Sequence, residues 1–296
     1  MTNSVKTAAL LGLLSGLLVL AGYSMTGSSQ GLVIGLLLAS VTTLGSWFYS
    51  DRIALAAYKA QPLSRDRSPK LYDMVSRLSK RANLPMPKLY AVPTQSPNAF
   101  ATGRDPEHAA FAVTEGIVDL LTPEELEGVI AHELTHIRNR DTLTQAVSGT
   151  LGGAVTFLGK MLSFGLLYSP ATRDDRQGGN PFAALILALV APLAASLVQL
   201  AISRTREFSA DAGAAQITGN PLALARALKK IEQVGLNIPI NGNPAMSPLL
   251  IINPVTREGI QRLFRTHPTT DERVKQLVSI SENQPVQNRT YSEAYG

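Results

Sequence analysis

The stretch His132-Glu133-Leu134-Thr135-His136 places two imidazoles four residues apart, with a carboxylate directly after the first. On an α-helical period of about 3.6 residues the two histidines project from one face, and the glutamate points to its flank. Two histidines so arranged can bind a zinc ion, and the glutamate can act on a water held there. The stretch predicts a zinc-dependent catalytic site with Glu133 as the general base.

A helix is predicted around these residues. Thr122 is the expected N-cap, Pro123 takes the first helical position, and Glu125 closes a capping box. Apolar side chains then recur at helical spacing, at Leu126, Val129, Ile130, Leu134 and Ile137. An amphipathic helix of this kind favours a metal site over the alternative, in which both histidines merely lie satisfied on a helix face.

A catalytic zinc site needs a third protein ligand. The chain has four histidines and no cysteine, which leaves His108, His267 or a carboxylate. We favour Glu207, because Asp211 follows four residues later and a helix would present both carboxylates on one face. Glu207 would then bind zinc, and Asp211 would orient a ligand imidazole through its other nitrogen. The alternative is an exposed acidic helix face that pairs with neighbouring arginines.

Four motifs resemble those of the HtpX family, membrane-bound zinc proteases of bacterial heat-shock response and membrane quality control, and more distantly those of the CAAX prenyl endopeptidases. They are Ser-Pro-Asn-Ala-Phe-Ala-Thr-Gly at 96–103, the zinc helix at 132–136, Ser-Arg-Thr-Arg-Glu-Phe-Ser-Ala-Asp at 203–211 and Leu-Phe-Arg-Thr-His-Pro at 263–268. The resemblance covers nearly the whole chain. It implies a mainly α fold with a small β-sheet, in an integral membrane metalloprotease of the zincin (gluzincin) type with transmembrane helices.

The resemblance also implies roles for individual residues. It makes His132, His136 and Glu207 the ligands of one zinc ion per chain, and Glu133 the general base.

Substrate contacts are implied as well. An edge strand containing Asn98, Ala99 and Phe100 would hold an extended substrate by backbone hydrogen bonds. His267 and Arg273 would help to stabilise the tetrahedral intermediate. The chain reads Thr269 where a second proline is common in the family, which weakens the assignment of His267. A histidine that caps a helix at 271–280 is the alternative.

The N-terminal region predicts a membrane anchor. Residues 7–50 contain no charged side chain, and they divide at a stretch rich in Gly and Ser, residues 22–30. Each half has about the 20 residues that cross a bilayer, so residues 1–52 predict a transmembrane hairpin. A cleavable signal peptide is the alternative. Cleavage of a signal peptide would leave the second apolar half of the hairpin still in need of burial. Trp47 and Tyr49, near the end of that half, suit a membrane interface.

A second hairpin is predicted at residues 142–202. If His136 and Glu207 bind one ion, the chain between them crosses the membrane an even number of times. Two apolar runs in this interval suit two crossings, while Lys160 and several glycines leave a buried pair of core helices as the alternative.

Charge predicts the orientation and the compartment. Basic residues crowd the exit of the first hairpin, at Arg52, Lys59, Arg65, Arg67 and Lys70, whereas its turn is uncharged. The positive-inside rule then places the catalytic part of a multi-pass inner-membrane protein in the cytoplasm. The net charge of +5 suits anionic lipid headgroups rather than nucleic acid, since no basic stripe is interleaved with aromatics. The absence of cysteine agrees with a reducing compartment.

The remaining residues, 53–141 and 203–281, predict one metalloprotease domain. We expect helices at 69–82 and 221–234, and strands at 88–92, 99–102 and 109–114. Residues 238–254 predict a flexible flap over the cleft, and 282–296 a polar tail.

The expected activity is a stress-response endopeptidase that cleaves misfolded or damaged membrane proteins. Its partners would be protein or peptide substrates and the lipid bilayer, and the sequence does not determine its oligomeric state. Two alternatives are an intramembrane protease, which the charges around the zinc helix disfavour, and a non-catalytic zinc-binding adaptor. Self-cleavage on addition of zinc would exclude the adaptor.

Overall fold

The computed structural model describes residues 28–147, 204–238, 249–252 and 268–283, with isolated positions between 8 and 19. Most of the predicted second hairpin, most of the first half of the N-terminal hairpin, and His267 lie outside the described residues.

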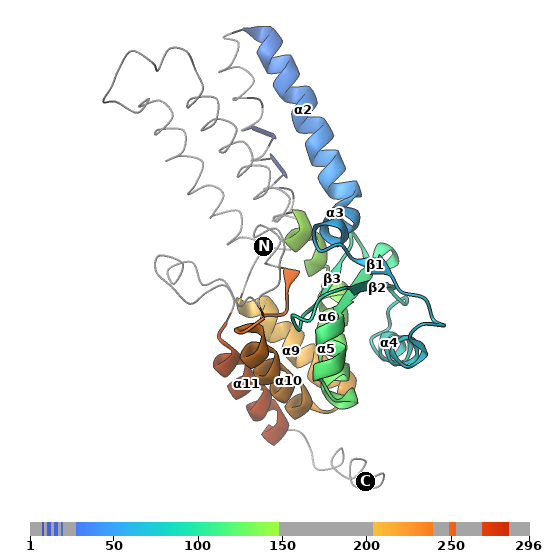
Figure 1. Cartoon of the computed structure of the whole chain (residues 1–296). Coiled ribbons are helices and arrows are strands. Elements are labelled where there is room, and N and C mark those ends of the chain that lie inside the picture. Colours follow the sequence, from blue (N-terminus) through green and yellow to red (C-terminus); the bar gives the residue numbers. More distant parts are fainter. Residues whose placement is uncertain are drawn as a thin grey trace, which may run out of the picture.

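The described residues form helices around a small mixed sheet (Figure 1). Its strands lie in the order β1 (Gln61–Pro62), β2 (Lys88–Val92), β4 (Ala110–Thr114) and β3 (Ala99–Thr102). β2 and β4 run parallel, whereas β1–β2 and β3–β4 are antiparallel. The three strands expected from the sequence are confirmed to within one residue, and β3 forms one edge of the sheet.

The helices also follow the sequence pattern closely. They are α2 (Ser29–Phe48), α3 (Ser50–Ala57), α4 (Pro69–Arg81), α5 (Glu115–Leu120), α6 (Pro123–Arg138), α9 (Arg204–Thr218), α10 (Pro221–Gly235) and α11 (Thr270–Asn283), with a 3-10 turn at Pro106–His108. The helices expected at 69–82 and 221–234 are confirmed. α3 runs across the predicted domain boundary after residue 52, so the structure shows a continuous helix at that boundary.

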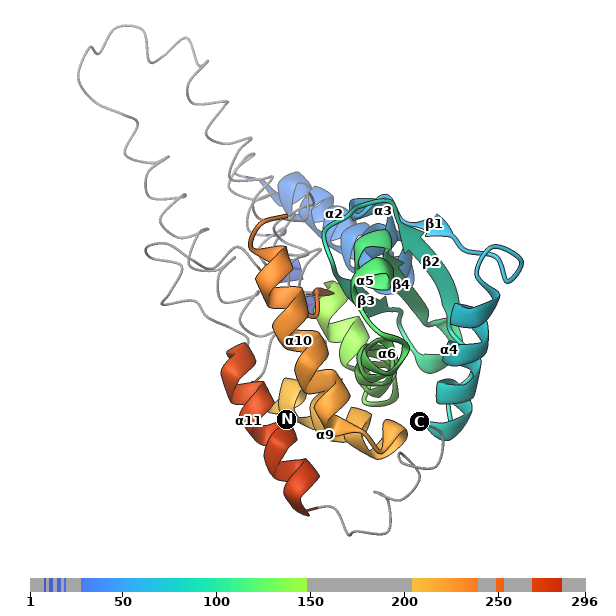
Figure 2. The ribbon, with the colours of Figure 1, turned by 60° about the horizontal axis from the view of Figure 1, so that its bottom comes forward.

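The zinc helix α6 lies between two parts of the molecule. Figure 2 shows the sheet on one side of it and α9, α10 and α11 on the other. All five apolar residues of the predicted stripe are buried in the core cluster that these elements share. Ala99 and Ala101 of β3 face this cluster, whereas Phe100 faces a second cluster with α3, because side chains alternate along a strand.

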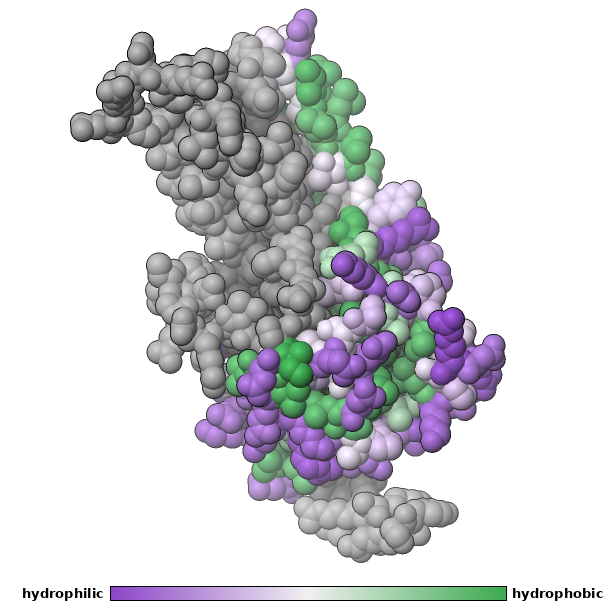
Figure 3. All heavy atoms as spheres, viewed as in Figure 1, coloured by the Kyte–Doolittle hydropathy of each residue, from purple (hydrophilic) through white to green (hydrophobic). Residues whose placement is uncertain are grey.

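α2 extends away from the domain and carries many exposed apolar side chains along its length (Figures 1 and 3). At its end the Arg104 guanidinium lies 4.7 Å from the centre of the Phe48 ring. Among the described helices, none is by itself long and apolar enough to cross a bilayer. By length and composition alone, the pair 29–45 and 50–57, bent by 77° at the break between its members, passes that test together.

Two expectations about loops are corrected. Residues 249–252 of the predicted flap are not free above a cleft, because Leu249, Leu250 and Ile251 are buried and the segment is hydrogen bonded to β3. The predicted tail begins inside α11, whose last residues are Glu282 and Asn283.

Candidate metal centre

The start of α6 is fixed by the capping box that the sequence predicts. Thr122 Oγ1 accepts from the Glu125 backbone N–H at 3.4 Å, and Glu125 Oε2 accepts from the Thr122 N–H at 3.0 Å. Lys230 Nζ of α10 donates to the same carboxylate at 2.7 Å. Burial alone would raise the pKa of Glu125, but the hydrogen bonds from Lys230 and Thr122 hold it below its usual value. Glu125 therefore both caps α6 and links this helix to α10 through the ion pair with Lys230.

α9 approaches α6 very closely at Gly213. A Cβ atom there would lie 2.4 Å from Cγ2 of Thr135, which stands between the two histidines of α6. Only glycine allows this approach without a shift, and the approach brings the Glu207 carboxylate of α9 to the histidines.

Three side chains from these helices converge. Nε2 of His132 lies 3.2 Å from Nε2 of His136, and Glu207 oxygens lie 3.6 Å from each of these nitrogens. All three residues are buried and form a group able to hold a metal ion. A tetrahedral zinc with ligands at about 2.05 Å requires roughly 3.3 Å between donor atoms. The observed triangle is close to that size, and the donor set is one that zinc prefers.

The outer nitrogens of both imidazoles are occupied by carboxylates. His132 Nδ1 lies 2.9 Å from Asp211 Oδ1, and His136 Nδ1 lies 2.9 Å from Asp141 Oδ2. A carboxylate at Nδ1 keeps the proton there and leaves the Nε2 lone pair for a metal. The two Nε2 atoms face Glu207 and can bind a metal ion once they carry no proton, so the residues present fit a zinc ion.

Asp141 is not among the site residues predicted from the sequence. This residue follows the end of α6 through Arg140, which has a left-handed backbone (φ 57°), and the turn brings its carboxylate back to His136. The sequence signal was an acidic residue just after the zinc helix, but helical spacing does not place it near the imidazole.

A charged network surrounds His132. Arg273 of α11 donates to Asp211 from Nε at 2.9 Å and from Nη2 at 2.6 Å, while its Nη1 lies 3.6 Å from Glu207. Burial alone would raise the pKa of Asp211, but the guanidinium holds it below its usual value. Burial and Arg273 act to lower the pKa of His132, yet hydrogen bonds to Asp211 and Glu207 outweigh them and raise it to about 9.

Glu133 lies between the metal ligands and the sheet. Its Oε2 accepts from the Ala101 backbone N–H of β3 at 2.8 Å, and the side chain is buried. Burial raises the pKa of this carboxyl, against the opposing effect of the two imidazoles. The carboxylate is thus held beside the edge strand, next to the candidate metal ligands.

The predicted substrate residues divide between the two sides of β3. Asn98 and Ala99 contact residues 249–252 at the side of β3 that faces away from β4. Phe100 pairs with Ala112 of β4, and its ring packs 5.1 Å from that of Tyr58, so it supports the strand from behind and does not face the edge. His108 is also remote from the metal ligands, because it is exposed and paired with Asp105 at 2.6 Å.

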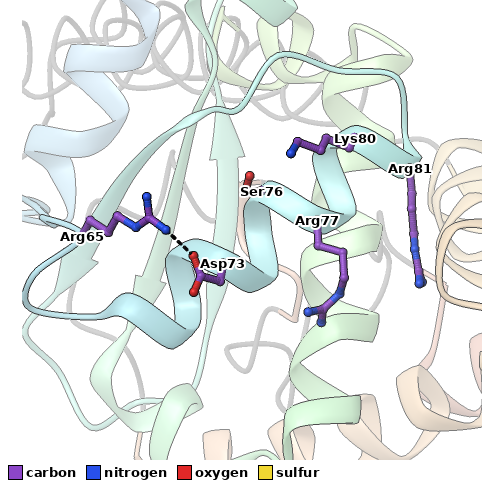
Figure 4. Close-up of a pocket in the computed structure, with 6 residues that line it drawn as sticks. All are labelled: Arg65, Asp73, Ser76, Arg77, Lys80 and Arg81. Carbon is purple, nitrogen blue, oxygen red and sulfur yellow. Dashed lines mark hydrogen bonds and ion pairs between the residues drawn. The ribbon is translucent and has the colours of Figure 1, made fainter.

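A surface hollow of about 600 Å³ lies beside α4 (Figure 4). It contains none of the candidate ligands, and two of its arginines are paired, Arg65 with Asp73 and Arg77 with Glu127. Its lining residues are Arg65, Asp73, Ser76, Arg77, Lys80 and Arg81.

Comparison with known proteins gives consistent results. Residues 65–281 match the model of peptidase family M48. The chain is 59% identical over 285 residues to a protein named "Protease HtpX homolog" from Nostoc punctiforme, covering 96% of this chain and 99% of the relative. It is 44% identical to a protein of the same name from Aquifex aeolicus, covering 90% and 89%.

A solved structure shares the fold. The crystal structure of S. mikatae Ste24p matches with a TM-score of 0.52 and 21% identity, over 93% of this chain and 64% of that one. The family match and the HtpX homologues show a metalloprotease, and within the described residues His132, His136 and Glu207 form a candidate zinc site. The chain therefore belongs to peptidase family M48, among the proteases of the HtpX type.

Proposed function

We propose that this metalloprotease is a zinc endopeptidase of the cell membrane that cleaves misfolded or damaged membrane proteins as part of quality control. The observation that carries the catalytic part is the convergence of His132, His136 and Glu207 within 3.6 Å, with Glu133 held beside them against the edge of β3.

His132, His136 and Glu207 would hold the zinc ion. When bound there, zinc polarises a carbonyl oxygen and makes water more acidic. Glu133 is the general base that takes a proton from the attacking water, and its bond to Ala101 keeps it in reach of a peptide on β3. Its raised pKa suits a base that must later give that proton to the leaving amine.

The surrounding residues position these groups. Asp211 and Asp141 each fix the tautomer and ring orientation of one histidine, as their 2.9 Å contacts with Nδ1 support. Arg273 has Nη1 directed toward Glu207 and can donate to an oxygen of the substrate. His267 is proposed to assist on the strength of the family resemblance alone.

The membrane arrangement is also proposed. Residues 1–52 and 142–202 form two hairpins, residues 53–141 and 203–283 form the protease domain on the cytoplasmic side, and 284–296 form the tail. The exposed apolar side chains of α2 and the aromatic residues at its end support the first hairpin. The relatives named HtpX support a membrane location.

The test is the Glu133→Gln variant of the full chain in detergent. We expect it to bind one zinc ion per chain and to lose cleavage of an unfolded protein by roughly 100-fold or more, because general-base catalysis contributes about that much. Zinc is measured by elemental analysis and cleavage by gel. Full cleavage by the zinc-loaded variant would refute the assignment. Membrane proteins that accumulate in cells carrying Glu133→Gln would identify the substrates.

A further inference from the structure

The edge strand β3 offers one side of its backbone to a ligand. Thr114 N of β4 donates to Asn98 O at 3.0 Å, and in an antiparallel pair the hydrogen-bonded residues alternate. The backbone groups of Ala99 and Ala101 therefore point away from β4. An extended peptide can add to such an edge as a further strand.

In this structure residues 249–252 lie on that edge. Ile251 N donates to Ala99 O at 3.3 Å and to Asn98 Oδ1 at 3.1 Å, and Asn98 Nδ2 donates to Ile252 O at 2.9 Å. Both ends of the Asn98 amide are thus used by the chain itself. The segment therefore occupies the Ala99 carbonyl and the Asn98 amide, two groups of this edge that an extended substrate could use.

The same segment also occupies the arginine of the site. Ile251 O accepts from Arg273 Nη1 at 3.1 Å, and this nitrogen is the one that lies 3.6 Å from Glu207. The Ile251 carbonyl therefore takes the donor that the proposed function assigns to a substrate oxygen. Ile251 is 3% exposed, so the contact is closed to water.

We propose that residues 249–252 are an autoinhibitory strap, which competes with substrate for the edge of β3 and for Arg273. This inference rests on the proposed function, because it takes β3 as the substrate-binding edge. A segment of the same chain competes at an effective concentration on the order of millimolar. The strap yields only to a polypeptide that can replace its backbone hydrogen bonds, which selects unfolded, extended stretches over folded proteins.

The test uses two variants at one position, in the zinc-loaded Glu133→Gln full chain in detergent. Ile251→Pro removes the N–H that bonds Ala99 and Asn98, whereas Ile251→Val keeps it. The probe is a fluorescent peptide with the sequence of residues 247–254. We expect the Pro variant to bind it about tenfold more tightly than the Val variant, since a larger fraction of molecules has a free edge. The same peptide methylated at the nitrogen that matches Ile251 should not bind either variant.

Equal or weaker binding by the Pro variant, with zinc content and melting temperature matching those of the Val variant, would overturn the proposal. If the Pro variant does not fold, hydrogen exchange in the Glu133→Gln chain decides the question. The Ile251 amide should lose protection when the peptide saturates the protein, and unchanged protection would refute the strap. Because no cleavage is measured, an inactive wild-type enzyme would refute the proposed function without altering this result.

Discussion

Removing the carboxylate of Asp141 tests whether this residue positions a zinc ligand. Asp141 Oδ2 lies 2.9 Å from His136 Nδ1, and its side chain is 1% exposed. Loss of such a partner weakens metal binding by about 10- to 100-fold, or roughly 1.4 to 2.7 kcal/mol. A hydrogen bond to a charged group contributes about 1.5 to 3 kcal/mol, which agrees. We expect about tenfold for Asp141→Asn, which keeps an acceptor oxygen, and about 100-fold for Asp141→Ala.

The assay is competition for zinc between the detergent-solubilised protein and a fluorescent chelator. Asp105→Asn is the matched control, because Asp105 pairs with the exposed His108 and should leave zinc affinity unchanged. Nitrogen NMR of the metal-free protein adds a readout that a merely structural role would not change. His136 should carry its proton on Nδ1 in the wild type and lose that preference in Asp141→Ala. Zinc affinity within twofold of wild type in a folded Asp141→Ala protein would refute the role.

Three further outcomes are expected. Gly213→Ala should lower the free energy of unfolding by about 1 to 3 kcal/mol and weaken zinc binding, since its Cβ would meet Thr135 at 2.4 Å. Thermal unfolding checks this, with Gly45→Ala as the control because a Cβ there meets nothing within 4 Å. Equal melting temperatures of the two variants would contradict the prediction. Because the pKa of metal-free His132 is about 9, zinc must displace a proton, and its affinity should rise about tenfold per pH unit up to that value. Calorimetry in two buffers should detect the released proton at pH 7, and its absence would contradict the raised pKa. Lys230→Met should lower the free energy of unfolding by about 0.5 to 1 kcal/mol at neutral pH.

The sign of the Lys230 effect with pH follows from Glu125. Its folded pKa is lowered, so the ion pair stabilises the protein above the carboxyl's unfolded pKa of about 4.3 and loses effect as pH falls through the folded value. The difference between wild type and Lys230→Met should therefore shrink below about pH 4. A difference that stays constant down to the acid unfolding transition would show that packing, rather than charge, is responsible.

Local spacing in the sequence determines much of this protein. The Thr122 capping box and the apolar stripe of α6 predict the zinc helix, and the interval of four residues predicts that His132 and His136 share a face. The same reasoning places Glu207 and Asp211 together on α9. These predictions succeed because a helix repeats its geometry every few residues, so neighbours in space are neighbours in the sequence.

Only the tertiary structure decides which distant groups meet. The left-handed turn at Arg140 brings Asp141 to His136, α11 brings Arg273 to Asp211, and residues 249–252 lie against β3 where the sequence predicts a flexible flap. No helical or strand period relates these pairs. Their contacts depend on how closely α9 packs on α6 at Gly213 and on which strand forms the edge of the sheet, and the packing of the whole core fixes both.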